Sequence, residues 1–142
     1  MKRYLLDTNI LIDYLARREP FGDDATELMQ AGAAGEVWLC VASLSFANIE
    51  YVMRRQTSTA RARQLLVLLE QLVEILAVDA GVIRQALASS FTDFEDGIQH
   101  FAALAHPAID AIITRDPKGF RAGTLPVLTV AQALTALDNR AE

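Results

Sequence analysis

The chain opens on the stretch Arg3-Tyr4-Leu5-Leu6-Asp7-Thr8-Asn9-Ile10-Leu11, which joins a strand to a helix through an aspartate. Residues 3–6 have the apolar character of a short buried strand. Apolar side chains then recur at helical spacing and predict a helix from Thr8 to Arg18; they are Ile10, Leu11, Tyr14 and Leu15. The sequence therefore begins with a β–α unit that carries Asp7 at the carboxyl end of its strand.

The same alternation of strand and helix continues to the end of the chain. Further short strands are predicted over residues 37–41, 73–78, 109–114 and 127–129. Helices are predicted over residues 23–33, 43–55, 59–69, 79–87, 92–104 and 131–137, and Ser43 is the expected N-cap of one of them. Such alternation favours a parallel sheet covered on both faces. We therefore expect an α/β/α sandwich with about five parallel strands, in a single domain over residues 1–142.

Composition fits one folded domain in a reducing compartment. The chain has 142 residues, of which 52% are hydrophobic and 22% charged, so it can bury a core and is not of the disordered class. Its N-terminus turns polar too soon for a signal peptide, and no apolar run reaches the roughly 18 residues of a membrane span. Cys40, the only cysteine, lies in an apolar run and is interpreted as a buried structural thiol. We expect a cytoplasmic protein that does not associate with membranes.

The net charge of −5 argues against a protein that binds nucleic acid through bulk positive charge. It does not argue against an enzyme that gathers carboxylates around a metal ion, because the ion inverts the local charge. Eleven of the 13 basic residues are arginine, whose planar guanidinium suits phosphate, although this bias in composition is a weak signal.

Three aspartates are predicted at one edge of the sheet. Asp7 follows the first strand and Asp116 the fourth, whereas Asp96 lies in the first turn of the helix that enters the fourth strand. In sheets of this kind the ligand site lies at the carboxyl ends of the strands. Asp110 lies at the other end of the same strand from Asp116, roughly 20 Å away at 3.3 Å per residue, and is therefore excluded from the site.

Each of these aspartates also has an ordinary structural explanation. Asp7 could cap the helix that follows it, and Asp116 is a natural turn residue. Asp96 could stabilise the N-terminus of its helix through the helix dipole, with residues 92–95 as a capping box. However, three carboxylates at one place repel one another unless a cation compensates them. Their hard oxygen atoms suit Mg²⁺ or Mn²⁺, so the cluster favours a site for one of these ions.

A divalent metal held by carboxylates favours phosphodiester hydrolysis. The ion lowers the pKa of a bound water and stabilises the oxygens of the transferred group. The sequence contains no motif for two other kinds of site. It has no glycine-rich nucleotide-binding fingerprint and no GxSxG turn that would present a nucleophilic serine. His100 and His106 have no partner at metal-ligand spacing and are interpreted as ordinary helix or loop residues.

Two parts of the sequence resemble PIN domains. The opening motif of that family is similar to Leu5-Leu6-Asp7-Thr8-Asn9-Ile10-Leu11-Ile12-Asp13. Its closing pair is similar to Asp93-Phe94-Glu95-Asp96-Gly97-Ile98-Gln99 and Ile112-Ile113-Thr114-Arg115-Asp116-Pro117-Lys118-Gly119-Phe120. The acids occur in the family's order, and the resemblance covers nearly the whole chain.

This resemblance implies a PIN sandwich and an endoribonuclease that depends on Mg²⁺ or Mn²⁺. Asp7, Asp96 and Asp116 would be the metal ligands, and Thr8, Asn9 and Thr114 would be polar groups that support them. Many bacterial members resemble the VapC toxins of toxin–antitoxin pairs. The resemblance therefore also implies single-stranded RNA as substrate, a small antitoxin protein as partner, and a homodimer.

The sequence departs from the family at one acidic position. PIN domains usually carry a glutamate early in the helix after the second strand, where this chain has Asn48 by register and Glu50 two residues later. Two residues turn a helix by about 200°, so only one of these side chains can face the site. We assign the catalytic role to Glu50 as the available carboxylate, although a pair with Arg54 at i,i+4 is an alternative.

One rival function remains open, and two others are disfavoured. If Asn48 faces the site, the chain could be a catalytically weak PIN domain that binds RNA or protein. A phosphatase of the haloacid dehalogenase type is disfavoured, because the position two residues after Asp7 holds Asn9 in place of an acid. A phospho-receiver domain is disfavoured because it needs paired acids after the first strand and a lysine near the last.

Overall fold

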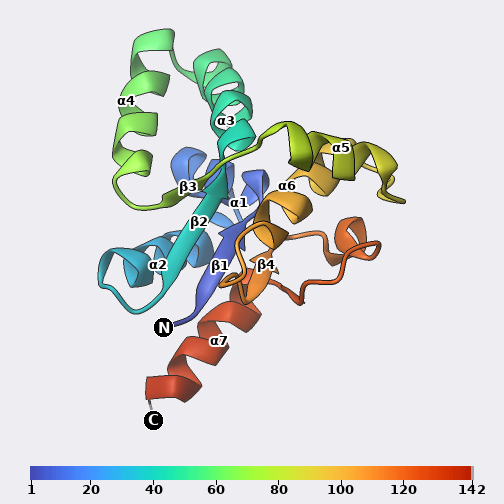
Figure 1. The fold of residues 1–142 in the computed structure, drawn as a ribbon. Helices are drawn as coiled ribbons and strands as arrows, with labels where there is room; N and C mark the ends of the chain where they lie inside the picture. Colours follow the sequence, from blue (N-terminus) through green and yellow to red (C-terminus); the bar gives the residue numbers. More distant parts are fainter. Residues whose placement is uncertain (142) are drawn as a thin grey trace.

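The structure of the protein is a computed structural model that describes residues 1–141. Its parallel strands form one sheet in the order β3-β2-β1-β4-β5. The strands are β1 (Arg3–Leu6), β2 (Trp38–Ala42), β3 (Glu74–Leu76), β4 (Ala111–Ile113) and β5 (Val127–Leu128). Helices cover both sides of this sheet (Figure 1), which confirms the predicted α/β/α sandwich.

The helices connect the strands in the expected sequence. They are α1 (Thr8–Ala16), α2 (Gly22–Ala33), α3 (Ser43–Gln56), α4 (Thr59–Glu70), α5 (Ala80–Ala88), α6 (Phe94–Leu104) and α7 (Val130–Ala141). A 3-10 helix that was not predicted, η1 (Pro117–Phe120), follows β4. Across residues 1–141, every helix falls short of the length and apolar character that crossing a bilayer requires.

The central strand β1 buries both of its faces, because successive side chains of a strand point to opposite sides of the sheet. Tyr4 and Leu6 pack in the core beneath α1, α2 and α7. Leu5, between them, packs on the other face with Ala103 of α6 and with Phe120. Burial on both faces explains why Tyr4, Leu5 and Leu6 form an uninterrupted apolar run in the sequence.

Side-chain caps fix the starts of several helices. Asp79 accepts a hydrogen bond from the backbone N–H of Val82 at the start of α5. Ser43 is not the cap that we expected, because it is the first residue of α3 and Ala42 holds the cap position. Its hydroxyl accepts a hydrogen bond from the backbone N–H of Val78, 3.1 Å away, and so ties α3 to the segment after β3.

Cys40 is fully buried in the sheet, as expected for a structural thiol. Its Sγ lies 3.7 Å from Oε2 of Glu74 on the neighbouring strand. Burial, together with the charge of Glu74, raises the pKa of this thiol to about 12. The thiol is therefore protonated at physiological pH and is a poor nucleophile.

Candidate active site

The pairing of β1 with β4 brings the first predicted acid to the end of the chain's fourth strand. Leu6 lies opposite Ile113 in the parallel register, and the backbone N–H of Asp7 donates to the Ile113 carbonyl at 2.9 Å. Asp7 and Thr114, which are 107 positions apart in the sequence, are thereby adjacent in space.

The Asp7 carboxylate is held by two side chains and is only 7% exposed. Its Oδ1 accepts a hydrogen bond from Nε2 of Gln99 at 3.0 Å, and its Oδ2 accepts one from the Thr114 hydroxyl at 2.7 Å. Asp7 occupies the N-cap position of α1, but its side chain makes no capping hydrogen bond. The capping explanation for this aspartate is therefore wrong.

Asp96 lies in the first turn of α6, half-buried beside other acids. The cap of this helix is Asp93, whose Oδ1 accepts a hydrogen bond from the Asp96 N–H at 3.0 Å. The Asp96 carboxylate is thus not needed as the cap. Burial raises its pKa to about 7, and the negative charges of Asp7, Asp93, Glu95 and Asp116 contribute.

Asp116 and Asp96 approach each other across Gly119. A Cβ atom at Gly119 would lie 2.6 Å from Oδ2 of Asp96 and 3.6 Å from Oδ2 of Asp116. Only a residue without a side chain leaves this space open between the two carboxylates. The backbone N–H of Asp116 donates to the Thr114 hydroxyl at 3.1 Å, which links Asp116 to the group that holds Asp7.

Thr8 connects the site to three other side chains. Its hydroxyl lies 2.8 Å from that of Ser45 on α3 and donates to Glu95 Oε1 at 3.3 Å, and its backbone N–H donates to Gln99 Oε1 at 3.3 Å. Thr8 and Thr114 therefore lie among the acids, as the family resemblance implied. Asn9 is exposed and takes no part in these contacts within the described residues.

Sequence reasoning missed Gln99 and Ser45, which are both about 1% exposed. A signal for Gln99 was present, because it lies three residues after Asp96 and such pairs share one face of a helix. Ser45 gives no comparable signal, since its role depends on where α3 packs against α1.

Asp110 lies at the opposite edge of the sheet, as predicted. Its Oδ2 accepts a hydrogen bond from the backbone N–H of Arg3 at 2.8 Å. Arg3 is the first residue of β1, whereas Asp7 follows the last one. The strand-end rule therefore separated Asp110 correctly from the acids of the site.

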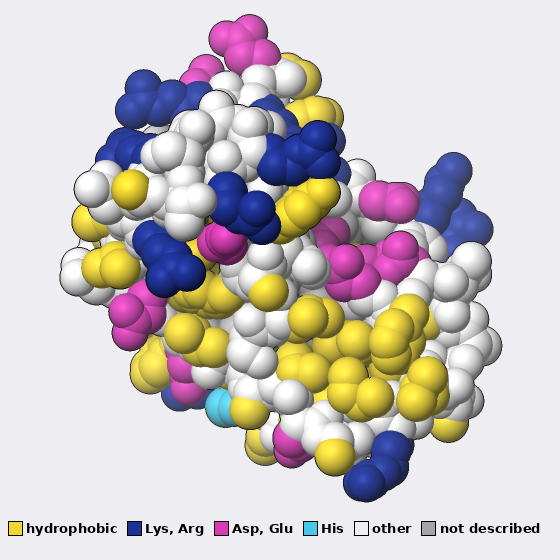
Figure 2. Space-filling view, turned by 90° about the horizontal axis from the view of Figure 1, so that it is seen from above, with side chains coloured by type: hydrophobic (Ala, Val, Ile, Leu, Met, Phe, Trp, Pro, Cys, Tyr) yellow, Lys and Arg dark blue, Asp and Glu magenta, His cyan; other side chains and the backbone are white. Residues whose placement is uncertain are grey.

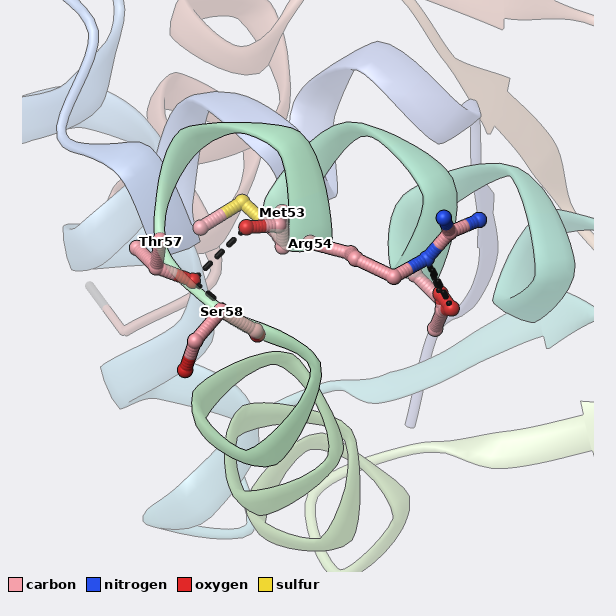
Figure 3. A network of polar contacts seen from close by, with 5 residues as sticks. Met53, Arg54, Thr57 and Ser58 are labelled. Atoms are coloured by element: carbon pink, nitrogen blue, oxygen red, sulfur yellow. Dashed lines mark hydrogen bonds and ion pairs between the residues drawn. The ribbon is translucent and has the colours of Figure 1, made fainter.

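Glu50 is paired with Arg54 and lies apart from the three aspartates. Its carboxylate accepts two hydrogen bonds from the Arg54 Nε, at 2.9 and 3.0 Å, which are the dashed contacts of Arg54 in Figure 3. It also lines a groove between α3 and α4 together with Arg63 and Glu70. The i,i+4 pair that we considered as the alternative role of Glu50 is therefore present.

The direction of Ser45 shows which side of α3 faces the site. Ser45 contacts Thr8, and at about 100° per residue Asn48 lies roughly 60° around the helix from Ser45, whereas Glu50 lies roughly 140° away. Asn48 is thus nearer to the acids than Glu50 is. This geometry speaks against the catalytic role that we assigned to Glu50.

A second ion pair, between Asp13 and Arg115, connects α1 to the segment that follows β4, and sequence reasoning did not identify it. Asp13 of α1 is fully buried, and its Oδ2 lies 2.8 Å from the Arg115 Nε and its Oδ1 3.9 Å from Arg18. Burial raises the pKa of the Asp13 carboxyl, and the two arginines oppose this rise. The Arg115 guanidinium also lies 4.2 Å from the ring centre of Phe21. Arg115 therefore fastens the segment between Thr114 and Asp116 to α1.

Comparison with known proteins agrees with this architecture. A family model described as the PIN domain matches residues 3–118. The chain belongs to the PIN-domain family. No curated protein matches the chain significantly in sequence.

Solved structures share the PIN fold with this chain at low sequence identity. VapBC-1 from nontypeable Haemophilus influenzae aligns with a TM-score of 0.68 and 19% identity, over 91% of this chain and 98% of that one. DNA-bound VapBC from Salmonella typhimurium gives 0.67 and 18%, over 92% and 99%. VapC20 from Mycobacterium tuberculosis, a toxin that cleaves the sarcin–ricin loop, gives 0.65 and 15%, over 86% and 96%. These likenesses establish a common fold.

The acids of this PIN domain suit a divalent cation by their chemistry. Asp7, Asp96 and Asp116 offer hard oxygen atoms, and their mutual repulsion raises the cost of keeping all three ionised. Within residues 1–141, no three acidic, histidine or cysteine side chains already stand at metal-ligand spacing. The three carboxylates therefore lie close enough to affect one another's charge, but they are not arranged as a set of metal ligands in this structure.

Asp96 should make the metal-free protein less stable as the pH rises. Its pKa is about 7 in the folded protein against an ordinary 3.8, so the folded state binds this proton more tightly than the unfolded state. The stabilisation is complete below the ordinary pKa and is lost as the pH rises through about 7. In EDTA, we expect the Tm of the wild type to fall more than that of Asp96→Asn between about pH 5 and 8. Equal pH slopes in thermal melts would contradict the raised pKa.

Proposed function

We propose that this PIN domain is an endoribonuclease that hydrolyses single-stranded RNA with Mg²⁺ or Mn²⁺ held by Asp7, Asp96 and Asp116. The observation that carries the proposal is the convergence of the three carboxylates at one sheet edge, where none of them caps a helix. A bound divalent ion lowers the pKa of water and stabilises charge on phosphate oxygens. RNA is the substrate class that the family resemblance implies.

The chain's own residues prepare the acids for this role. Gln99 and Thr114 each donate one hydrogen bond to Asp7 and so fix the orientation of its carboxylate. Each carboxylate oxygen has two lone pairs, so both retain capacity for a further ligand. Without a cation, the raised pKa leaves Asp96 about half protonated near pH 7. Gly119 keeps the space between Asp96 and Asp116 open.

The purified protein with Mn²⁺ should cleave single-stranded RNA internally, and EDTA should abolish the cleavage. Attack by water that displaces the 3′-oxygen leaves 5′-phosphate and 3′-hydroxyl ends, and no 2′,3′-cyclic phosphate forms because the 2′-hydroxyl of the RNA does not act as the nucleophile. End labelling of the products checks this. A 2′,3′-cyclic phosphate would rule the mechanism out, since it requires attack by the RNA's own hydroxyl group.

We further propose that the protein is the toxin of a toxin–antitoxin pair, is cytoplasmic, binds a small antitoxin protein and forms a homodimer. The support is the likeness of its fold to structures described as VapBC and as a toxin–antitoxin complex. A small antitoxin-like reading frame next to the gene would strengthen this proposal.

A second candidate function is a catalytically weak PIN domain that binds RNA or protein. Asn48 favours it, because an asparagine stands where the family usually carries a glutamate. Failure to cleave several RNAs, with Mn²⁺ demonstrably bound, would support this candidate.

The fourth position of the site can be tested by paired substitutions. Because Asn48 lies on the Ser45 side of α3 and Glu50 is engaged with Arg54, we now expect Asn48→Ala to lower cleavage more than Glu50→Gln. Asn48→Asp should also tighten Mn²⁺ binding in calorimetry by adding a carboxylate near the others. The opposite order of effects on cleavage would restore our first assignment of Glu50.

A further inference from the structure

Positive charge in this acidic chain is concentrated in the hairpin of α3 and α4. Residues 43–70 contain four arginines and two glutamates, a net charge of +2, so the remainder of the chain carries −7. Figure 2 shows basic side chains gathered over the side of the molecule that carries α3 and α4, with acidic side chains in the hollow beside it. Arg54, Arg55, Arg61 and Arg63 are all exposed.

One stripe of α3 leads from the candidate active site into this basic region. Leu44, Asn48, Tyr51 and Arg55 follow each other at i, i+4, i+7 and i+11, which places them on one face of the helix. Leu44 packs against the cluster that contains Ile98 of α6. Leu44 therefore faces α6, whose first turn holds Asp96, and the stripe leads away from there, because Tyr51 lies about 120° around the helix from Ser45.

Tyr51 and Arg55 combine an aromatic face with a phosphate donor. Tyr51 is 50% exposed. Arg55 Nη1 donates to the Tyr51 hydroxyl at 2.8 Å, and its guanidinium lies 5.6 Å from the ring centre. Arg54 lies 5.5 Å from the same ring but is engaged by Glu50, so Arg55 retains more free donors.

These positions follow one another along the helix at short intervals. A rise of 1.5 Å per residue separates Asn48 from Tyr51 by about 4.5 Å and Tyr51 from Arg55 by about 6 Å. A single strand can therefore contact the ring and the guanidinium together. Exposed aromatic rings stack on unpaired bases, and arginine binds the backbone phosphates between them.

We propose that single-stranded RNA reaches the acids along the stripe of Asn48, Tyr51 and Arg55, with one base stacked on Tyr51 and a phosphate bound by Arg55. This inference rests on the proposed ribonuclease function and extends it to a track for the substrate. The track supplies the positive charge that the chain as a whole lacks, beside a cluster of acids that would otherwise repel the RNA backbone.

Binding is measured in the full chain carrying Asp96→Asn, by fluorescence anisotropy with a labelled single-stranded RNA over a series of salt concentrations. Tyr51→Ala should weaken binding at least about fivefold, and Tyr51→Phe should retain most of the affinity, because the stacking face is kept. Arg55→Gln should weaken binding and lower the slope of log K against log salt by about 0.7. Lys2→Gln removes an exposed charge near the opposite edge of the sheet and should change neither quantity.

The same substitutions in the active protein separate this inference from the proposed function. Tyr51→Ala and Arg55→Gln should raise KM for a long RNA and leave kcat nearly unchanged. If the wild type cleaves RNA but neither substitution alters KM or affinity, the track is wrong and the ribonuclease proposal stands.

If no RNA is cleaved but binding still depends on Tyr51 and Arg55, the track stands as a binding surface and the catalytic proposal fails. If these substitutions instead weaken only the binding of an acidic protein partner, the surface is a protein interface and the RNA track is overturned.

Discussion

Asp96→Asn is expected to abolish RNA cleavage while the protein remains folded. Asp96 lies beside Asp7 and Asp116, and its carboxylate borders the space that Gly119 leaves open. Loss of one preorganised electrostatic group at a reacting centre costs about 10²–10³ in rate. The side chain is half-buried and its backbone N–H, which Asp93 caps, is unaffected by the substitution. The rate is measured with Mn²⁺ on single-stranded RNA, and folding by circular dichroism.

The matched control is Asp110→Asn, which makes the same chemical change at the other edge of the sheet. Asp110 binds the backbone N–H of Arg3 and lies far from the acids, so cleavage should stay near the wild-type rate. Mn²⁺ affinity measured by calorimetry should fall for Asp96→Asn and remain unchanged for Asp110→Asn. Two equally damaging substitutions would show that the strand ends do not define the site.

Arg115→Ala should destabilise the fold by about 3 kcal/mol, because removal of one partner leaves a buried charge uncompensated. Asp13 is fully buried, and Arg115 is its nearest cation at 2.8 Å. A loss of this size lowers the Tm of a domain of this length by roughly 10 °C. Burial already raises the pKa of Asp13, so the carboxyl can escape the cost by protonation at low pH. The loss should therefore be larger at about pH 8 than at about pH 5.

The double variant Asp13→Asn/Arg115→Ala distinguishes the charge effect from lost packing on Phe21. It removes both charges, so its free energy of unfolding should lie above that of Arg115→Ala alone at about pH 8. Urea unfolding of the wild type, both single variants and the double variant measures this coupling. Strictly additive losses would mean that the Asp13–Arg115 contact does not contribute.

The sequence was sufficient to predict the features that depend on local pattern. Strands and helices alternate as expected, because buried parallel strands read as apolar runs and the helices between them keep their own periodicity. The parallel arrangement then placed Asp7 and Asp116 at one edge and Asp110 at the other. These assignments need only the direction of each strand.

Contacts between distant segments could not be predicted in the same way. Gln99 and Thr114 bind Asp7 from two other elements, and Arg115 meets Asp13 across about a hundred residues. The choice between Asn48 and Glu50 depends on how α3 is rotated against α1, and a local motif does not specify that rotation. Ser43 has the right side chain for a cap, yet its hydroxyl is used by Val78.

The place of β1 between β2 and β4 has a consequence during protein synthesis. Asp7 leaves the ribosome well before Thr114, which lies 107 residues later in the chain and donates the hydrogen bond that orients the Asp7 carboxylate. A nascent chain that has not yet produced β4 holds its acids on separate, unpaired segments. The three carboxylates are therefore assembled only after β4 and Asp116 have been synthesised, and truncated products that end before Asp116 lack one of the three acids altogether.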